Sequence, residues 1–589
     1  MSGKAAAEPA AAPPAPRASG QRPHRRPLRR VAAVRGLLRG HWQLAAVLGA
    51  FLATAALLPT LAPVAISDDW AYARSVEILL ADRRLQILDV ASASALFQIL
   101  WGAPFGALTD NTFGALRLAT VVFVALSGWA FYGLCRQLGL ARPSSALGSA
   151  LYLFNPVGFA LAYTFMTDPY FTGLLVFAAY LYARGLRDDP RATRFLWAGS
   201  VAATLACLQR STGVLIPLAV AAFFVLTGRA RPDRHGALAV ARVAAVPLLS
   251  TAAFFVIASY TGGVASAQAA FMRAALGAGW GDTALVAGRL AFIQVMYAGF
   301  FALPAMAAAA GRIPRLVSRL TARGWTVVAL GLLLLFGGLT SFGNGRLMPY
   351  VGQFFNRAGT GPADLVGGRP EAFGRIWAAA LTTACAYAAL LLTVSLVGTL
   401  GKRVRRADVA GLVFALLLVQ AVAAVLPSLS VIESFVSFDR YLLPLLPLAV
   451  GLALWSVQGV QPRLVVAWVL TGCLAVYSAV GTRDLLVFQS TVWELAERLT
   501  DEGVPPTKID AGYAWDGYHV HDPSARDMKP RTRRGPWWTQ TLAPATDSTY
   551  VVASHREPGY EPVERVGYSS MLHRGPVHLY VLRREDRSR

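Results

Sequence analysis

The sequence predicts an all-α polytopic membrane protein of about thirteen transmembrane helices, followed by a small extracytoplasmic α/β domain at the C-terminus. Three observations predict this class: an apolar composition, a long series of apolar segments, and basic loops that alternate with poorly charged ones. Hydrophobic residues make up 55% of the 589 residues and charged residues only 15%, whereas a soluble domain carries about 25% charged residues. So much apolar side-chain surface requires lipid as its solvent.

The net charge of +23 raises the question of a nucleic-acid partner. The arginines gather in the first forty residues, in the last hundred or so, and in short runs between apolar segments. No zinc-finger spacing and no aromatic-basic ribonucleoprotein motif accompanies them, so we expect no nucleic-acid binding. The cysteines lie far apart, in or beside apolar segments, and we interpret them as buried apolar side chains rather than disulfides or a zinc site; they are Cys135, Cys207, Cys385 and Cys473.

Residues 1–41 are rich in Ala, Pro and Arg and predict a disordered basic tail on the cytoplasmic side. The apolar run at 42–64 is long enough to cross a hydrocarbon layer of about 30 Å. A cleaved signal peptide is the alternative interpretation, but the basic region is long and no clean small-x-small site precedes Ser67. We therefore expect an uncleaved first span with the N-terminus in the cytoplasm.

Twelve further apolar segments complete a transmembrane domain at 42–480. They are 118–135, 146–162, 169–183, 195–208, 214–227, 243–260, 285–310, 325–339, 376–400, 409–426, 441–455 and 465–480. Each connection expected on the cytoplasmic side contains several basic residues, as the positive-inside rule requires. They are Arg136 and Arg142, Arg184 to Arg194, Arg229 to Arg234, Arg312 to Arg323, and Lys402 to Arg406. An odd number of spans places the C-terminus outside.

Two long outward segments and a tail surround this domain. The first outer loop, 65–117, contains helix-like apolar spacing after Trp70, which predicts an amphipathic helix on the membrane surface. The outer loop at 341–375 is Gly-rich and holds Asn344, Arg346 and Asp364, which suits a mobile lid or an acceptor-binding loop. Residues 481–589 predict the small α/β domain, with a short helix at 491–500 and strands near 508–515, 550–554 and 577–582.

Two acidic sites stand at the same predicted membrane level. Asp68 and Asp69 follow the first span, and Asp168 precedes the span at 169–183. Each has a structural interpretation, since Asp68-Asp69 can cap the next helix, and Asp168 before Pro169 is typical of a helix start. Placed together at a lipid–water boundary, the same carboxylates can bind a cation or deprotonate a sugar-acceptor hydroxyl.

Two arginines lie near the same level. Arg210 stands between two short apolar runs, and Arg440 stands where the penultimate outer loop meets its next span. Either can simply extend to lipid headgroups. An arginine at this boundary also suits the phosphate of a lipid carrier, because its planar guanidinium forms paired hydrogen bonds with phosphate oxygens.

These residues resemble the membrane glycosyltransferases of the C-type (GT-C) fold, particularly the family of protein O-mannosyltransferases and bacterial lipid A aminoarabinose transferases. The resemblance covers about 42–480. It rests on Asp68-Asp69 with Tyr72, on Phe165-Met166-Thr167-Asp168-Pro169, on Gln209-Arg210-Ser211-Thr212-Gly213, on Asp439-Arg440-Tyr441-Leu442-Leu443-Pro444, and on Gly512-Tyr513-Ala514-Trp515.

The resemblance implies transfer of a hexosyl or pentosyl unit from a polyprenyl-phosphate donor to a lipid, glycan or protein acceptor at the outer face of the inner membrane, with inversion. It implies Asp68 or Asp69 as the base and Asp168 as a group that orients the acceptor or holds a cation. Arg210 and Arg440 would stabilise the departing phosphate. A further set of substrate-binding residues is implied, namely Tyr72, Tyr441 and Gln209. The resemblance assigns no certain cofactor, and a divalent cation is a candidate.

One departure bears on the acceptor: the pair is Asp-Asp, where Asp-Glu is common in the protein O-mannosyltransferases, so a protein acceptor is not assigned. The rival hypotheses are a transporter or flippase of lipid-linked sugars and a structural membrane subunit. Transporters often consist of two similar halves with broken helices at matching places, and the sequence shows no such repeat.

Overall fold

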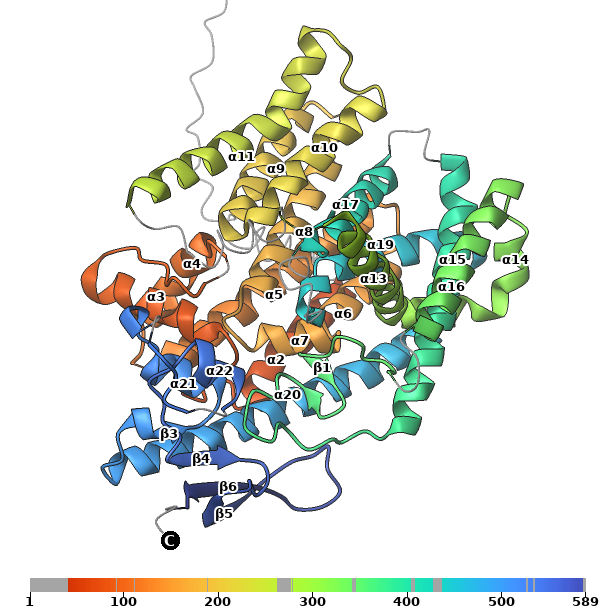
Figure 1. The fold of residues 1–589 in the computed structure, drawn as a ribbon. Helices are drawn as coiled ribbons and strands as arrows, with labels where there is room; N and C mark the ends of the chain where they lie inside the picture. The colour runs from red at the N-terminus through yellow and green to blue at the C-terminus, as the bar shows by residue number, and fades with distance from the viewer. Residues whose placement is uncertain are drawn as a thin grey trace, which may run out of the picture.

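The computed structural model describes residues 41–585 apart from 92, 111, 188, 262–276, 278, 342–345, 404–407, 427–436, 526–527 and 533–534. The predicted tail therefore lies outside the described residues up to residue 40, as do Asn344, Arg405 and Arg406. The described chain is mostly helical, with a small sheet near its C-terminus (Figure 1).

The first half of the chain is helical throughout. Its helices are α2 (Trp42–Leu57), α3 (Asp69–Asp82), α4 (Leu96–Gly106), α5 (Thr112–Gln137), α6 (Arg142–Leu153), α7 (Pro156–Ala162), α8 (Thr167–Gly185), α9 (Ala192–Gln209), the 3-10 turn η1 (Ser211–Val214), α10 (Leu215–Leu226) and α11 (Arg234–Thr261).

The second half continues with α13 (Trp280–Ala309), η2 (Ala310–Arg312), α14 (Ile313–Val317), α15 (Ala322–Ser341), α16 (Arg375–Arg403), α17 (Val409–Ala423), η3 (Asp439–Leu442), α19 (Leu445–Val457), η4 (Gln458–Val460) and α20 (Leu464–Asp501). A two-stranded hairpin, β1 (Phe355–Asn356) and β2 (Gly359–Thr360), lies in the predicted outer loop 341–375.

By length and composition, six described helices can cross a membrane, or seven if the bent pair α6–α7 counts as one span. Every predicted apolar segment contains a helix, but the count of about thirteen spans is not confirmed. Four of the helices are shorter apolar ones, namely Trp42–Leu57, Ser211–Leu226, Val409–Ala423 and Leu445–Val460. The predicted spans at 169–183 and 195–208 form α8 and α9, which pack on each other, and α8 is buried along most of its length.

Two predicted spans differ in shape from the expectation. The run at 42–64 is helical only as far as Leu57, because Pro59 and Pro63 follow, and proline cannot continue a helix. The run at 146–162 bends by 65° between α6 and α7. At that bend the side chain of Asn155 accepts a hydrogen bond from the N–H of Val157 at 3.2 Å, and Pro156 starts α7.

The C-terminal part contains η5 (Pro506–Lys508), β3 (Ile509–Asp510), α21 (Tyr513–Val520), η6 (Pro523–Ala525), α22 (Trp537–Thr541), β4 (Tyr550–Ala553), β5 (Tyr560–Tyr568) and β6 (Val577–Arg584). The four strands form one sheet in the order β3-β4-β6-β5, with only the β3–β4 pair parallel. Figure 1 shows this sheet beside the end of α20, with α21 next to α3 and α22 beside α21.

Three details of the predicted tail are wrong. The helix expected at 491–500 is the end of α20, which continues unbroken from Leu464 to Asp501. It stops there because Gly503 adopts a left-handed φ of 91°, and the N–H groups of Gly503 and Val504 bond the carbonyls of Thr500 and Leu499. The strand expected at 508–515 ends at Asp510, and its remainder begins α21. Strand β5 was not predicted.

Candidate active site

Asp68 lies at the start of α3 but does not cap it. Its side chain makes no capping hydrogen bond. One carboxylate oxygen lies 2.9 Å from Nη1 of Arg440, in η3, and the other accepts a hydrogen bond of 2.5 Å from the hydroxyl of Tyr513, at the start of α21. The Asp68 side chain is 28% exposed. The structure therefore presents it as an accessible carboxylate held by groups from two distant segments.

Asp69, the next residue, has different surroundings from Asp68. It is buried, and its carboxylate accepts the backbone N–H groups of Ile66 at 2.6 Å and Phe165 at 3.4 Å. Burial raises the pKa of Asp69 to about 7, although the charge of Arg117 and the two backbone hydrogen bonds act to lower it. Asp69 thus connects the chain around Ile66 to the chain around Phe165 through backbone hydrogen bonds. Its buried carboxylate is not accessible to a substrate.

Arg117, on α5, forms hydrogen bonds with the chain segments that precede Asp68 and Asp168. Its buried guanidinium donates to the carbonyls of Thr60, Ala62 and Val64, which precede Asp68 in the chain. It also donates to the carbonyl of Tyr163, just before the turn to Asp168. A guanidinium can satisfy several acceptors at fixed angles, so Arg117 sets the spacing between these two segments.

Asp168 is the second residue of α8, and Met166 is the N-cap, so Asp168 lies at a helix start, in the first turn, without capping the helix. One carboxylate oxygen pairs with Nη1 of Arg210 at 2.6 Å, and the Asp168 side chain is only 1% exposed. Its other oxygen, Oδ2, has no hydrogen-bond partner among the described residues. Arg210 follows the last residue of α9 in extended backbone, which directs this end of the helix toward α8.

Two tyrosines connect the ion pairs. The ring of Tyr441 lies 5.9 Å from the guanidinium carbon of Arg210 and 5.4 Å from that of Arg440, within cation–π range of both. Tyr72, on the buried face of α3, interacts with the charges of all four ion-pair residues. Burial and then the charge of Asp68 raise the pKa of Tyr72, so its hydroxyl stays protonated. The two ion pairs therefore form one cluster.

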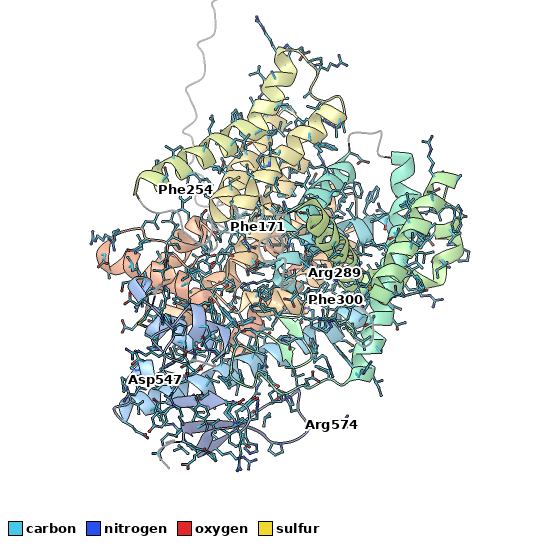
Figure 2. All side chains as sticks on the ribbon, viewed as in Figure 1. Phe171, Phe254, Arg289, Phe300, Asp547 and Arg574 are labelled. Atoms are coloured by element: carbon cyan, nitrogen blue, oxygen red, sulfur yellow. The ribbon has the colours of Figure 1, made fainter. Side chains whose placement is uncertain are left out.

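This cluster lies where the helical body meets the C-terminal part. Arg210 also approaches the ring of Phe171 at 6.0 Å, and Phe171 lies among the central helices in Figure 2, away from Asp547 near the C-terminal strands. The groups come from α3, α8, the end of α9, η3 and α21. Each of these elements contributes from one of its ends, where backbone direction changes and side chains can converge.

Gln209 is not part of the cluster. Its amide donates to Oε1 of Gln98 at 2.7 Å, and its own Oε1 accepts the backbone N–H of Gln98 at 3.1 Å. It joins the end of α9 to the start of α4. Asp439, beside Arg440, is likewise buried and accepts the N–H groups of Phe354 and Phe355 at 2.7–3.1 Å, which ties the outer loop to η3.

Two further residues belong to the site and were not predicted as site residues. Tyr513 is one; the only signal for it was its place in the stretch Gly512 to Trp515. Asp364, in the outer loop, is the other. Burial and the charge of Asp68 raise the pKa of Asp364 to about 6, while Arg440 lowers it. The carbonyl of Asp364 accepts the N–H of Tyr513 at 3.1 Å, so the loop and α21 approach Asp68 together.

Divalent-cation binding has no ready site among the residues that the structure describes. They contain no group of three or more His, Cys, Asp or Glu side chains that could hold a metal ion. Asp68 and Asp168 instead each face an arginine. Arg210 and Arg440, each paired with one of these carboxylates, are the groups of the cluster that could interact with an anionic ligand.

Comparisons with known proteins agree with the predicted resemblance. Residues 99–259 match the family model described as dolichyl-phosphate-mannose-protein mannosyltransferase. This confirms the resemblance over a segment that contains Asp168 and Arg210, and the matched segment ends before Arg440 and begins after Asp68. No curated protein matches the sequence.

Solved structures of similar shape include the archaeal oligosaccharyltransferase AglB from Archaeoglobus fulgidus, in complex with an inhibitory peptide and a dolichol-phosphate. It is 15% identical, with a TM-score of 0.43, over 80% of this chain and 59% of that chain. ArnT from Cupriavidus metallidurans, bound to undecaprenyl phosphate, is 15% identical, with a TM-score of 0.35, over 77% of this chain and 80% of that chain. The present chain thus spans about three fifths of the length of AglB.

Proposed function

We propose that this chain is a membrane glycosyltransferase that transfers a sugar from a polyprenyl-phosphate donor to an acceptor hydroxyl. The family match over residues 99–259 supports a glycosyltransferase with a lipid-phosphate-linked donor. The observation that carries the proposal is the cluster itself: the accessible carboxylate of Asp68 shares one site with Arg440, Arg210 and the buried Asp168.

In the proposed reaction, Asp68 takes the proton of the acceptor hydroxyl as its oxygen attacks the anomeric carbon. The bond from that carbon to the phosphate oxygen breaks, and its electron pair leaves with the lipid phosphate. Attack from the side opposite to the phosphate inverts the anomeric centre. A phosphate leaves as an anion, so no carboxylic acid is needed to protonate it.

The two arginines stabilise the charge that grows on the leaving phosphate. Approach of the phosphate draws Arg440 partly away from Asp68, which frees the carboxylate for the acceptor. Asp168 keeps Arg210 in place, and its buried Oδ2, which has no hydrogen-bond partner among the described residues, is the oxygen that would accept a substrate hydroxyl. Tyr72 and Tyr441 line the same space, whereas Asp69 and Gln209 have structural roles.

We further propose an orientation. The N-terminus lies in the cytoplasm and the cluster lies at the outer face of the inner membrane, with the C-terminal part outside. The alternation of basic loops along the sequence supports this arrangement. The acceptor is a lipid, a glycan or a protein.

The test is Asp68→Asn in the full chain, reconstituted in liposomes with a panel of polyprenyl-phosphate sugars. Loss of the base is expected to slow transfer by about 100-fold or more. Glu77→Gln is the matched control, because Glu77 also lies on α3 and also accepts a tyrosine hydroxyl from α21, that of Tyr518 at 3.1 Å. Full transfer by Asp68→Asn would exclude it as the base, and a chain that moves the donor across the bilayer without transfer would be a flippase.

A further inference from the structure

A cavity of about 230 Å³ lies at the far end of α19 from the candidate active site. It is lined by Arg319, Gly398, Thr399, Trp455, Ser456, Gln458 and Gly459. Helix α19 starts directly after η3, which carries Arg440, and ends at Val457 beside the cavity. A helix of 13 residues separates its ends by about 20 Å, so the cavity is distinct from the Asp68 cluster.

Arg319 is the one charged residue among those that line the cavity. It follows the short helix α14 and is half-buried. A Cβ added at Gly459 would lie 3.0 Å from Nη2 of Arg319, and one added at Gly398 would lie 3.1 Å from its Cβ. The two glycines therefore make the room that the arginine and the cavity occupy.

The guanidinium of Arg319 has no carboxylate partner within the part of the chain that the structure describes. Two hydroxyl groups also line the cavity: that of Thr399 donates to the carbonyl of Ser395 at 2.8 Å, and that of Ser456 donates to the carbonyl of Ala453 at 2.8 Å. A half-buried cation without a counter-ion favours an anionic ligand, because the partly apolar surroundings strengthen the attraction.

The chain segments around the cavity are also positively charged. The connections at 310–324 and 458–463 contain arginines but no Asp or Glu; the arginines are Arg312, Arg315, Arg319, Arg323 and Arg463. Trp455 supplies an apolar wall that leads from the cavity into the helical body. A basic pocket between apolar helices, with an aromatic side chain at its edge, has the chemistry that recognises a lipid headgroup.

We propose that this cavity binds a phosphate group, carried by an anionic phospholipid whose acyl chains lie against the neighbouring helices. Arg319 forms the charge-assisted hydrogen bonds to the phosphate oxygens. Figure 1 places α14 and α3 at opposite sides of the molecule. The proposal is therefore independent of the transfer reaction, and either can fail alone.

The other explanation is structural. The last turns of α16 and α19 meet at the cavity, and Arg319 can stabilise the partial negative charge of their ends without a ligand. That role predicts a lower melting temperature on removal of the charge, with no change in lipid binding. Lipid binding has to be measured directly to separate the two.

The experiment is native mass spectrometry of the detergent-purified full chain, titrated with phosphatidylglycerol or with phosphatidylcholine. We expect the wild type to bind phosphatidylglycerol about tenfold more tightly than phosphatidylcholine, since phosphatidylglycerol has a net negative charge, whereas the choline ammonium cancels the phosphate charge of phosphatidylcholine. Arg319→Ala should abolish this preference, and Arg319→Lys, which retains the charge without the planar fork, should reduce it. Arg315→Ala is the matched control, because Arg315 is an exposed residue of α14.

Three results would overturn the proposal. Equal affinity of the wild type for both lipids is one, and an unchanged phosphatidylglycerol preference in Arg319→Ala is another. The third is displacement of the bound lipid by millimolar inorganic phosphate with retention of phosphate itself, which would assign the cavity to free phosphate.

Discussion

The two ion pairs of the cluster use the same residue types in different surroundings. Asp68 and Arg440 lie 2.9 Å apart, and the Asp68 side chain is 28% exposed. Asp168 and Arg210 lie 2.6 Å apart, and the Asp168 side chain is 1% exposed. Asp68 has a second partner in Tyr513, whereas the second oxygen of Asp168 has none among the described residues.

The difference separates two tasks. A base must meet its substrate and exchange a proton, so it needs access and partners that can be displaced. A buried carboxylate held at short range by one arginine instead fixes that arginine, because separating the pair would leave a charge with little hydration. We therefore associate Asp68 with proton transfer and the Asp168–Arg210 pair with orientation and charge.

The largest effects on transfer and on stability are expected when each arginine is removed in turn. Arg440→Ala is expected to lower transfer by about 100- to 1,000-fold, as loss of one group that stabilises transition-state charge does, and to weaken donor use more than acceptor use. Arg210→Ala leaves the buried Asp168 unpaired and should also lower the unfolding free energy by about 3–5 kcal/mol. Transfer kinetics and thermal unfolding in detergent measure the two effects.

Arg498→Ala is the control for these variants, because Arg498 forms an ion pair with Glu564 in which both side chains are largely exposed. Such pairs contribute about 0–1 kcal/mol. Equal loss of stability in Arg440→Ala and Arg210→Ala would mean that burial does not distinguish the two pairs.

The order of helices, and the approach of four charged residues from distant segments, could be predicted from hydropathy and the family resemblance. Arg440 and Asp68 are 372 residues apart in the chain, yet both stand at the boundary of an apolar segment, which limits where they can lie. The sequence could not distinguish Asp68 from Asp69, because their directions depend on the backbone N–H of Phe165 and on Arg117, whose partners are carbonyls.

The site residue Tyr513 and the continuity of α20 were missed because both depend on backbone geometry and tertiary contacts. Tyr513 reaches Asp68 only because Gly512, with a φ of 87°, turns the chain from β3 into α21, and an isolated Gly-Tyr pair carries no such signal. The continuity of α20 was missed because its polar half, from 481 onward, packs against the sheet and the outer loop instead of lipid. The change from apolar to polar composition near residue 481 therefore indicates a change of surroundings and not the end of a helix.

Asp69 offers a sharper contrast within the first acidic segment. Burial raises its pKa from the usual 3.8 to about 7 in the folded chain, so the folded state prefers the protonated form. This contribution to stability is complete below pH 3.8 and is lost as the pH rises toward 7. The melting temperature of the wild type should therefore fall between pH 5 and pH 7.5, and Asp69→Asn should flatten that slope.

The slope, and not the absolute melting temperature, tests this prediction, because asparagine also loses one of the two acceptor oxygens that Asp69 presents. Glu77→Gln is again the control, since the Glu77 side chain is 24% exposed. A slope that Asp69→Asn leaves unchanged would assign the pH dependence to other buried carboxyls, such as Asp510, whose pKa burial raises to about 6.

The smallest expected effect concerns the partner that Asp68 has and Asp168 lacks. Tyr513→Phe removes a hydrogen bond to the anionic carboxylate of Asp68, so we expect transfer to lose rate mainly at the acid end of its pH profile. Burial and the charge of Asp68 raise the pKa of Tyr513 well above its usual value, so the phenol is a donor throughout the assay range. The charged and titratable groups that face Asp68 are Arg440, Tyr513, Asp69, Tyr72 and Asp364.

Tyr518→Phe provides the matched comparison, since Tyr518 joins α21 to α3 through Glu77 in the same way, at 3.1 Å. If α21 only supports α3 mechanically, both phenylalanine variants should lower the maximal rate alike and leave the acid limb in place. If Tyr513 acts on the carboxylate, only Tyr513→Phe should move the acid limb, with the rate at high pH close to that of the wild type. Because both substitutions remove one hydroxyl from the same helix, the difference between their pH profiles isolates the contact with Asp68 from the general packing of the C-terminal part.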